Sequence, residues 1–432
     1  MTISKERRWQ IACVGILLIA FLLRVSAAFW WQSKADSEGI LFRFGDSYSY
    51  WTLAGRIANG EPYQYGSPDS KMFRVPLYPL FLSPFTRFEP GVGILLARVA
   101  GCALGTFCVY LIMVAARRLA DRRAAVCAGL LAAVFPGAIG MSAFVLSEAI
   151  FCPLALCSLL LWQMAWLSNE GTARARLFAL ASGLASGLAC LARPSWILWP
   201  GVLLLFLLVQ KTNHFVLIKK YFWFLVAMTA TMLPWWVRNY QITHRFVPTT
   251  LQVGATLYDS LHPGASGGSD ENMEWVDRFA SEQRYEDNES GKAESTFEYR
   301  LDRRMGNAAI AWALENPSDV ARLALLKFRR TWSPVLSAEQ VSNLWIRIIE
   351  ACAYVTILIL SAIGWWQMRD RSKTVGIFIL PSLYCAGLHL IFVGSIRYRQ
   401  PALLILCVVA GIGLAWILER AFWIRAARTG NV

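Results

Sequence analysis

Apolar stretches long enough to cross a lipid bilayer recur along the whole chain, separated by short polar segments. A membrane-spanning helix needs roughly 17 to 25 mainly apolar residues to cross the hydrocarbon core. Ten stretches come close to that length: 9–30, 92–115, 124–141, 145–167, 177–192, 195–210, 220–237, 344–366, 375–394 and 399–418. The pattern therefore predicts an all-α polytopic integral membrane protein, built as a bundle of about 10 transmembrane helices.

Two long polar segments interrupt this pattern and divide the chain. Residues 1–237 are expected to form a transmembrane core that carries a first extracytoplasmic loop, 31–91. Residues 238–343 are expected to form a large extracytoplasmic loop with amphipathic helices. Residues 344–432 are expected to supply the C-terminal transmembrane helices and a cytoplasmic tail.

Both loops contain helix-forming patterns. In the first loop, residues 47–60 have apolar positions at helical spacing and end at Asn59–Gly60, which predicts a short amphipathic helix. The second loop begins with a Gly-rich, acidic stretch and then reads as two helices, 294–315 and 321–332. The break between them is expected at Asn316–Pro317, because proline cannot continue a helix that precedes it.

The amino-acid composition agrees with a membrane location. Hydrophobic residues make up 56% of the chain and charged residues only 16%, whereas soluble domains carry about 25% charged residues. The net charge of +14 would also suit a nucleic-acid-binding protein. Its distribution argues against that class and leaves no nucleic-acid partner, because a cytoplasmic N-terminus places +13 on the inner segments, against 0 and −3 on the two large loops. Both termini are therefore predicted to be cytoplasmic.

Charged residues in the first loop and at the outer ends of the predicted spans are the candidates for a functional site. Ionisable groups near or inside a membrane are costly and usually have a function. Six of them are predicted to meet at the outer membrane boundary: Asp46, Arg74, Glu148, Arg193, Arg397 and Arg399. Arginines bind phosphate through two parallel hydrogen bonds, and a carboxylate can accept a proton from a nucleophile.

Each of these residues also has a structural interpretation. Asp46 could cap the helix that follows it, and Glu148 could pair with an arginine only to hold helices together. The arginines could extend to lipid headgroups. Arg397 and Arg399 lie close to Pro401 on the side of the membrane where basic residues are disfavoured, so they call for an explanation.

Several short motifs in family order resemble a known superfamily. They are GDSYSYWTLAGRIANGEPY with FRVPLYPLFLSPF in the first loop, then LSEAIF, LARPSW, LPWWVRNY, ENP and RYRQP. Together they resemble the dolichyl-phosphate-mannose–protein mannosyltransferases and the lipid A aminoarabinose transferases, which are glycosyltransferases of the GT-C class. Two features depart from the family pattern. Asp46 is followed by Ser47 where several members carry an Asp–Glu pair, which leaves metal use open, and a large soluble C-terminal domain is missing, which leaves the acceptor open.

The resemblance implies a membrane glycosyltransferase that moves a hexose or pentose from a polyprenyl-phosphate donor to an acceptor, with inversion. Asp46 would act as the general base and Glu148 as a second acidic group that holds the acceptor or a divalent metal ion. Arg397 and Arg399, helped by Arg193 or Arg74, would bind the donor phosphate.

The location follows from the loops, which are short and lie on one side of the membrane, and the partners follow from the resemblance. The active site would face the periplasm or exterior of a bacterial inner membrane. The acceptor would be a lipid, a polysaccharide or a protein, and membrane lipids would surround the bundle. Two alternatives remain at this point: a lipid or sugar transporter or flippase without transferase chemistry, and a structural membrane subunit.

Overall fold

A computed structural model of the protein describes residues 5–169, 171–210, 214–270, 272–291, 295–335 and 343–428, and within them all regular secondary structure is helical. The helices are α1 (Lys5–Glu38), α2 (Gly45–Ala58), α3 (Leu77–Leu82), α4 (Pro90–Leu119), α5 (Arg122–Val134), α6 (Pro136–Ala143), α7 (Glu148–Leu167), α8 (Ala173–Ala192), α9 (Trp199–Leu208), α10 (His214–Thr243), α11 (Val253–Ser260), α12 (Trp275–Ser290), α13 (Phe297–Glu315), α14 (Pro317–Trp332), α15 (Leu344–Gln367), α16 (Ser372–Ile391) and α17 (Ile396–Arg428). Short 3₁₀ turns cover Phe85–Arg87, Pro194–Trp196 and Arg369–Arg371.

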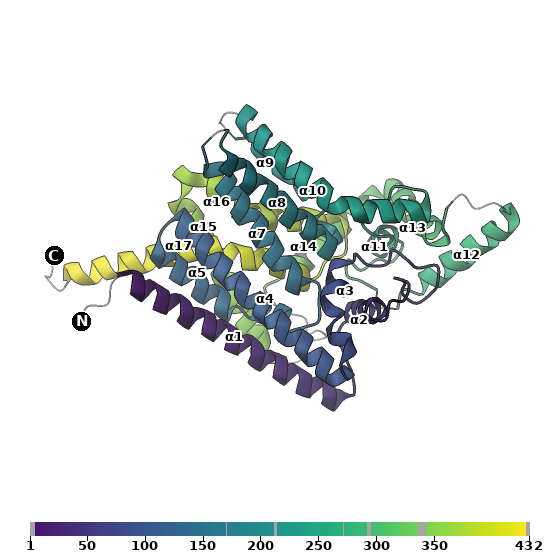
Figure 1. Ribbon diagram of the computed structural model, residues 1–432, viewed down its shortest axis with the longest axis horizontal. Coiled ribbons are helices and arrows are strands. Elements are labelled where there is room, and N and C mark those ends of the chain that lie inside the picture. The colour runs from purple at the N-terminus through teal and green to yellow at the C-terminus, as the bar shows by residue number, and fades with distance from the viewer. Residues whose placement is uncertain are drawn as a thin grey trace.

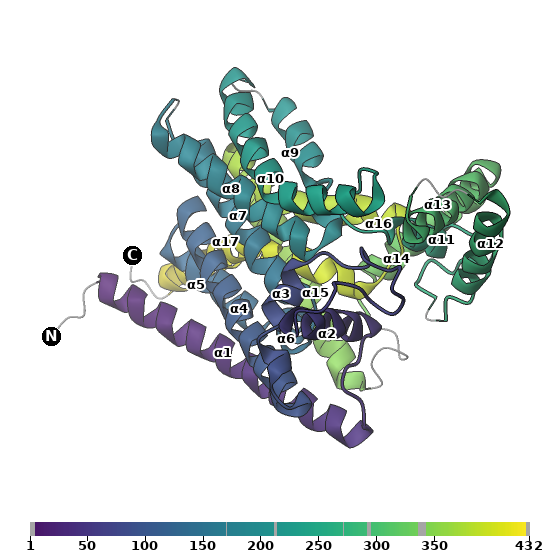
Figure 2. The ribbon, with the colours of Figure 1, turned by 45° about the vertical axis from the view of Figure 1, so that its right-hand side comes forward.

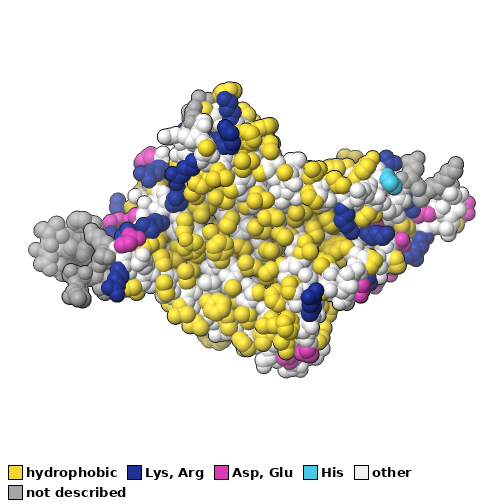
Figure 3. Space-filling view, viewed as in Figure 1, with side chains coloured by type: hydrophobic (Ala, Val, Ile, Leu, Met, Phe, Trp, Pro, Cys, Tyr) yellow, Lys and Arg dark blue, Asp and Glu magenta, His cyan; other side chains and the backbone are white. Residues whose placement is uncertain are grey.

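Eight helices in the described part of the chain are long and apolar enough to cross a membrane. They are α1, α4, α7, α8, α10, α15, α16 and α17. Apolar side chains cover the middle of the bundle face, and lysines and arginines gather towards its ends (Figure 3). The all-α membrane fold is therefore confirmed.

Two of the ten predicted spans have a different form. The stretch predicted at 124–141 is a pair of helices, α5 and α6, bent by 57° at Phe135. Phe135 precedes Pro136, and a residue before proline is driven out of the helical region. Arg24 of α1 donates to the carbonyl oxygens of Ala132 and Ala133 at the end of α5, 3.0 and 3.2 Å away, and so satisfies acceptors that the bend leaves free. The stretch predicted at 195–210 is the short helix α9 after a 3₁₀ turn.

Helix α17 forms the centre of the bundle. In its apolar stretch 72% of the residues are buried, and it packs against α5, α15 and α16. Gly364 of α15 and Gly413 of α17 allow the closest approach, because a Cβ atom at Gly413 would lie 2.1 Å from the carbonyl oxygen of Leu360. Helices α15 and α17 are thereby packed closely together around Gly413.

The remaining helices gather at one end of the bundle (Figure 2). Helices α11 to α14 enclose a small apolar core of their own, made of Tyr258, Leu261, Phe279, Met305, Ala309 and Leu323. The predicted break at Asn316–Pro317 is confirmed, with α13 ending at Glu315 and α14 beginning at Pro317. Helices α2 and α3 lie at the same end, and α1 begins and α17 ends at the opposite end (Figure 1). We refer to residues 251–335 as the outer module.

Candidate active site

Asp46 lies in the first turn of α2 but does not cap the helix. The N-cap residue is Phe44, and no side chain caps this end. The Asp46 carboxylate instead accepts from two guanidiniums, with Oδ1 2.7 Å from Nη2 of Arg74 and Oδ2 2.9 Å from Nη2 of Arg397. Its side chain is 33% exposed, so a molecule arriving from the aqueous side can reach it. The capping interpretation of Asp46 is wrong.

Glu148 is the first residue of α7, and its side chain is fully buried. Oε1 accepts from Nη1 of Arg193 at 2.7 Å and from Nε of Arg397 at 2.9 Å. The Ser147 hydroxyl lies 3.4 Å from Oε2. A carboxylate in the first turn of a helix is favoured by the partial positive charge of the helix N-terminus, which helps to offset the cost of burying it.

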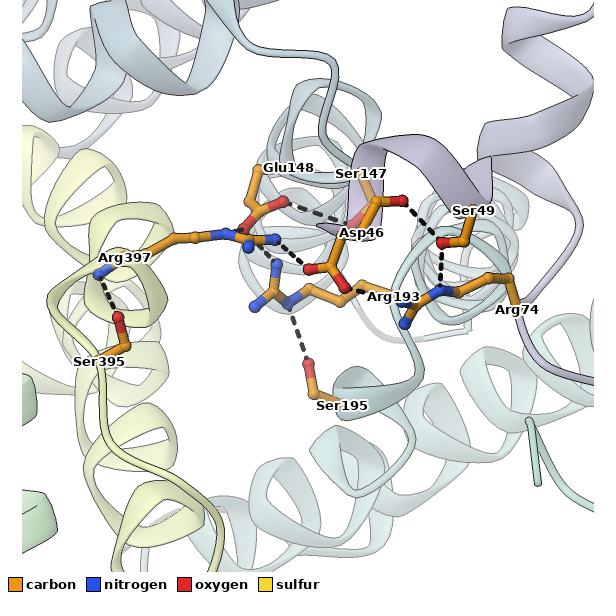
Figure 4. A network of polar contacts seen from close by, with 9 residues as sticks. All are labelled: Asp46, Ser49, Arg74, Ser147, Glu148, Arg193, Ser195, Ser395 and Arg397. Atoms are coloured by element: carbon orange, nitrogen blue, oxygen red, sulfur yellow. Dashed lines mark hydrogen bonds and ion pairs between the residues drawn. The ribbon is translucent and has the colours of Figure 1, made fainter. Parts of the chain in front are cut away.

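The two carboxylates and three arginines form one alternating chain of charges: Arg74, Asp46, Arg397, Glu148, Arg193 (Figure 4). They come from α2, the segment before α3, α7, the end of α8 and the start of α17. Arg397 contacts both carboxylates and therefore joins the two halves of the chain. Three guanidiniums against two carboxylates leave a net charge of +1. We call these five residues the charge cluster.

Local sequence explains how two of the arginines reach the cluster. Arg193 precedes Pro194, which holds it in an extended conformation (φ −143°, ψ 110°) and ends α8. The side chain thus leaves the helix towards Glu148, and its Nε donates to the Ser195 hydroxyl at 3.3 Å. Arg397 lies in the first turn of α17, with its guanidinium 5.0 Å from the centre of the Phe44 ring.

Ser49 is a part of the site that the sequence did not single out. Its hydroxyl accepts from Nε of Arg74 at 3.0 Å and donates to the backbone carbonyl of Asp46 at 2.7 Å. The residue is buried, one helical turn after Asp46. That i, i+3 spacing on a predicted helix is the signal that could have identified it.

Arg399 is not part of the charge cluster. Its fully buried guanidinium donates to the backbone carbonyls of Thr331, at 3.0 Å, and Ser333, at the end of α14. It also lies 3.9 Å from the centre of the Tyr354 ring. The expectation that Arg399 joins the other five residues at one site is therefore wrong, because Arg399 bonds to the end of α14. Successive residues turn by about 100° around a helix, so Arg397 and Arg399 face different sides of α17.

The arginines keep Asp46 ionised. Burial alone would raise the pKa of this carboxyl, but the guanidiniums of Arg74 and Arg397 outweigh burial and hold the pKa below its ordinary value. The pKa of Arg74 is raised in turn, because the attraction of Asp46 exceeds the opposing effect of burial. In this state Asp46 is a carboxylate of reduced basicity.

The two carboxylates do not fit a metal site in this arrangement. The Arg397 guanidinium bonds to both Asp46 and Glu148, so a cation between them would have to displace it. In the described ranges there is no group of three or more His, Cys, Asp or Glu side chains placed to hold a metal ion.

A small cleft of about 40 Å³ opens beside Arg193, between α7, α16 and α17. Its polar lining comes from Arg193, Ser195, Tyr384, His389 and Tyr398, and the rest is largely apolar, with Phe151, Trp196, Leu388 and Ile405. An apolar cleft that ends at a guanidinium suits a ligand with an anionic head and a hydrocarbon tail.

Comparison with known proteins supports the resemblance seen in the sequence. Residues 73–248 match the family model of dolichyl-phosphate-mannose-protein mannosyltransferases. This segment contains Arg74, Glu148 and Arg193, and the resemblance to that family is confirmed over it. No curated protein matches the chain in sequence.

Solved structures with a similar fold are distant in sequence. The archaeal oligosaccharyltransferase AglB from Archaeoglobus fulgidus, in complex with an inhibitory peptide and a dolichol-phosphate, is similar with a TM-score of 0.61 at 15% identity, over 99% of this chain and 52% of that chain. The oligosaccharyltransferase of the same organism in complex with Zn and sulfate has a TM-score of 0.56 at 14% identity, over 95% of this chain and 50% of that chain. ArnT from Cupriavidus metallidurans bound to undecaprenyl phosphate has a TM-score of 0.43 at 17% identity, over 97% and 80%. The chain thus shares the fold of the archaeal enzyme and spans about half its length.

Proposed function

We propose that this protein is a membrane glycosyltransferase that moves a sugar from a polyprenyl-phosphate donor to an acceptor, with inversion at the anomeric carbon. The observation that carries the proposal is the Arg397 guanidinium, which bridges a partly exposed carboxylate, Asp46, and a buried one, Glu148. The family match over residues 73–248 supports a glycosyltransferase. The dolichol-phosphate bound to AglB, which has the same fold, supports a lipid-linked donor.

The charge of the cluster suits this donor. A sugar linked to a lipid through one phosphate is a phosphodiester with a single negative charge, and the cluster has a net charge of +1. The phosphate would bind Arg193 and Arg397, with the first part of the lipid chain in the cleft beside Arg193. Arginine serves this purpose because its planar guanidinium matches two phosphate oxygens.

The transfer would be a single displacement. An acceptor hydroxyl attacks the anomeric carbon, its proton passes to the Asp46 carboxylate, and the carbon–oxygen bond to phosphate breaks with its electron pair staying on the phosphate. Arg397 and Arg193 stabilise the charge that develops on that oxygen. A phosphate leaving group needs no proton, so the site requires guanidiniums but no general acid.

Binding of the donor would also prepare the base. Asp46 is weakly basic while it shares Arg397 with Glu148. A phosphate that takes over part of the Arg397 guanidinium would weaken the pairing with Asp46 and raise the pKa of Asp46 towards its ordinary value. Proton abstraction would then be favoured only when the donor is in place.

In this proposal Glu148 positions the two phosphate-binding arginines and does not contact the substrates. Its side chain has no exposed surface and both its strong contacts are with Arg193 and Arg397. We therefore assign it to holding the two phosphate-binding arginines at a fixed separation, in place of holding the acceptor or a metal.

The orientation in the membrane, the type of sugar and the type of acceptor are also part of the proposal. The charge cluster would face the periplasm or exterior of a bacterial inner membrane, with both termini in the cytoplasm, which agrees with α1 beginning and α17 ending at the opposite end of the bundle (Figure 1). The sugar would be a hexose or a pentose, and the acceptor a lipid, a polysaccharide or a protein.

The direct test is transfer from labelled polyprenyl-phosphate sugars by the purified protein in proteoliposomes. The wild-type protein should release polyprenyl phosphate and label an acceptor fraction. Asp46→Asn should insert and fold normally but transfer about 10²–10⁴-fold more slowly, the range for loss of a general base. Movement of labelled lipid or sugar across the membrane without product would favour the transporter alternative, and full activity of Asp46→Asn would remove Asp46 as the base.

A further inference from the structure

Glu298 of α13 is a buried carboxylate that binds the first loop. Its oxygens accept from the backbone N–H groups of Lys71, at 2.8 Å, and Met72, at 3.0 Å, and from the Ser70 hydroxyl at 3.3 Å. The side chain is almost fully buried, and these donors are neutral. Burial of a carboxylate is costly even when it is hydrogen-bonded, so this contact calls for a structural or functional reason.

Residues 71–72, which Glu298 binds, make further contacts with α10 and with the segment that follows it. Met72 is fully buried against Val247 and Leu251. The backbone N–H of Leu251 donates to the Met72 carbonyl at 3.0 Å, and Arg238 donates to the Lys71 carbonyl at 3.1 Å. The backbone of residues 71–72 is therefore fixed at both its N–H and its carbonyl groups.

Arg74 follows this fixed segment by two residues. Its guanidinium bonds to Asp46 at 2.7 Å and to Ser49 at 3.0 Å, while the Tyr63 hydroxyl donates to its backbone carbonyl at 3.1 Å. Two residues of chain transmit a displacement of Met72 almost directly to Arg74. The position of the Arg74 guanidinium is thus coupled to a contact made by α13.

A second carboxylate on the same helix provides a comparison. Asp302 is four residues after Glu298, is equally buried, and accepts from the backbone N–H of Gly254 at 2.7 Å. Gly254 lies in α11, within the outer module. Asp302 therefore makes the same kind of contact, but to α11 and with no direct bond to residues 70–74.

We propose that Glu298 is a positioning residue for the transfer reaction, which holds Arg74 against Asp46 by binding the backbone of Lys71 and Met72. The inference rests on the proposed function. It also couples the outer module to the candidate active site, because α13 carries a group that sets the geometry around the base.

A double-mutant cycle on transfer activity tests the coupling. Glu298→Ala should lower kcat about tenfold, Arg74→Met should lower it at least as much, and the double variant should be no slower than Arg74→Met alone. Glu298→Gln keeps an acceptor oxygen for the two N–H groups and should stay within about threefold of wild type. Asp302→Ala, with Asp302→Asn as a milder form, should leave kcat within about twofold. Multiplicative losses in the double variant, or an equal loss in the Asp302 variants, would overturn the proposal.

Amide hydrogen exchange tests the same coupling without any activity. Glu298→Ala should speed exchange at residues 70–74 and also in the first turn of α2, whereas Asp302→Ala should speed it around Gly254 only. Arg74→Met should affect the first turn of α2 and leave the amides of Lys71 and Met72 protected. Normal protection of α2 in Glu298→Ala would contradict the proposal. If this exchange pattern holds while the wild-type protein transfers no sugar, the transferase assignment fails and the positioning of Arg74 stands.

Discussion

Arg397 and Arg399 are two residues apart on α17, yet they serve different parts of the molecule. The Arg397 guanidinium bridges Asp46 and Glu148, with both contacts at 2.9 Å. The Arg399 guanidinium is fully buried and donates to the Thr331 carbonyl at the end of α14. Arg397 thus supplies charge to the candidate active site, and Arg399 attaches the outer module to the bundle.

Substitution should separate these two roles. Arg397→Ala is expected to slow transfer about 10²–10³-fold, the usual effect of removing one group that stabilises developing charge. Arg399→Ala is expected to lower the free energy of unfolding by about 2–4 kcal/mol, because it leaves buried carbonyl groups without donors. Transfer rates and thermal unfolding midpoints of both variants in the same detergent would check this.

The two variants act as controls for each other. Arg399→Ala, measured well below its unfolding midpoint, should retain most of the wild-type rate. A rate as low as that of Arg397→Ala, with an unchanged unfolding midpoint, would instead show that Arg399 binds the donor.

The pH dependence of transfer should report the pairing of Asp46 with Arg74. Because the pKa of Asp46 is lowered by Arg74 and Arg397 in the free protein, Asp46 stays ionised at mildly acidic pH, and the wild-type kcat/KM, which reports the free enzyme, should be flat with respect to this group. Arg74→Met removes one positive neighbour, so the pKa of Asp46 should rise and the rate should fall at the acidic end, where the carboxylate becomes protonated. Rate profiles between about pH 4 and pH 8 would measure this shift.

Arg56 supplies a matched control on the same helix as Asp46. It pairs with Glu61 at 3.5 Å, away from the cluster. Arg56→Met should keep the wild-type pH profile, and an acidic shift as large as that of Arg74→Met would mean that general loss of positive charge on the loop is responsible.

The positions of most cluster residues could be predicted because the ends of spans share one level in a membrane. That argument brought Asp46, Glu148 and Arg193 together across more than a hundred residues, and it needed no tertiary detail. It failed for Arg399, because the last span was expected to begin at 399 while α17 begins at Ile396. The helical turn then separates two arginines that would have been neighbours in a loop.

The contact between Glu298 and the first loop had no signal in the sequence. Its shortest contacts are with the backbone N–H groups of Lys71 and Met72, more than two hundred residues away. Backbone donors carry no side-chain identity, so any residue type at 71 and 72 other than proline could supply them. Only the fold reveals why a buried glutamate lies on α13.

Glu298 should make the stability of the protein depend on pH. Burial raises the pKa of this carboxyl, despite its hydrogen bonds, from an ordinary value of 4.5 to about 7. Between these values the unfolded chain has lost the proton and the folded protein keeps it, so stability should fall as pH rises towards 7 and then level off. The contribution corresponds to about 3 kcal/mol over that interval.

Thermal unfolding of Glu298→Gln at a series of pH values would isolate this effect. The variant cannot ionise at 298, so its unfolding midpoint should depend less on pH between about 5 and 7 than that of the wild-type protein. Glu274→Gln, at an exposed position in the outer module, should keep the wild-type dependence. Parallel curves for the wild-type protein and Glu298→Gln would show that Glu298 does not titrate in this interval.

The cleft beside Arg193 should determine affinity for the lipid part of the donor. Leu388 of α16 lines the cleft, and Leu390 of the same helix is exposed away from it. Leu388→Trp fills the cleft of about 40 Å³ and should raise the KM for the polyprenyl-phosphate donor about tenfold, the effect of losing roughly 1.4 kcal/mol of binding. The kcat should change little, because Asp46 and Arg397 are not displaced.

Leu390→Trp should match the wild-type protein in both constants. A reduced kcat with an unchanged donor KM in Leu388→Trp would mean that the donor lipid lies elsewhere and that the cleft contributes only to packing around Arg193.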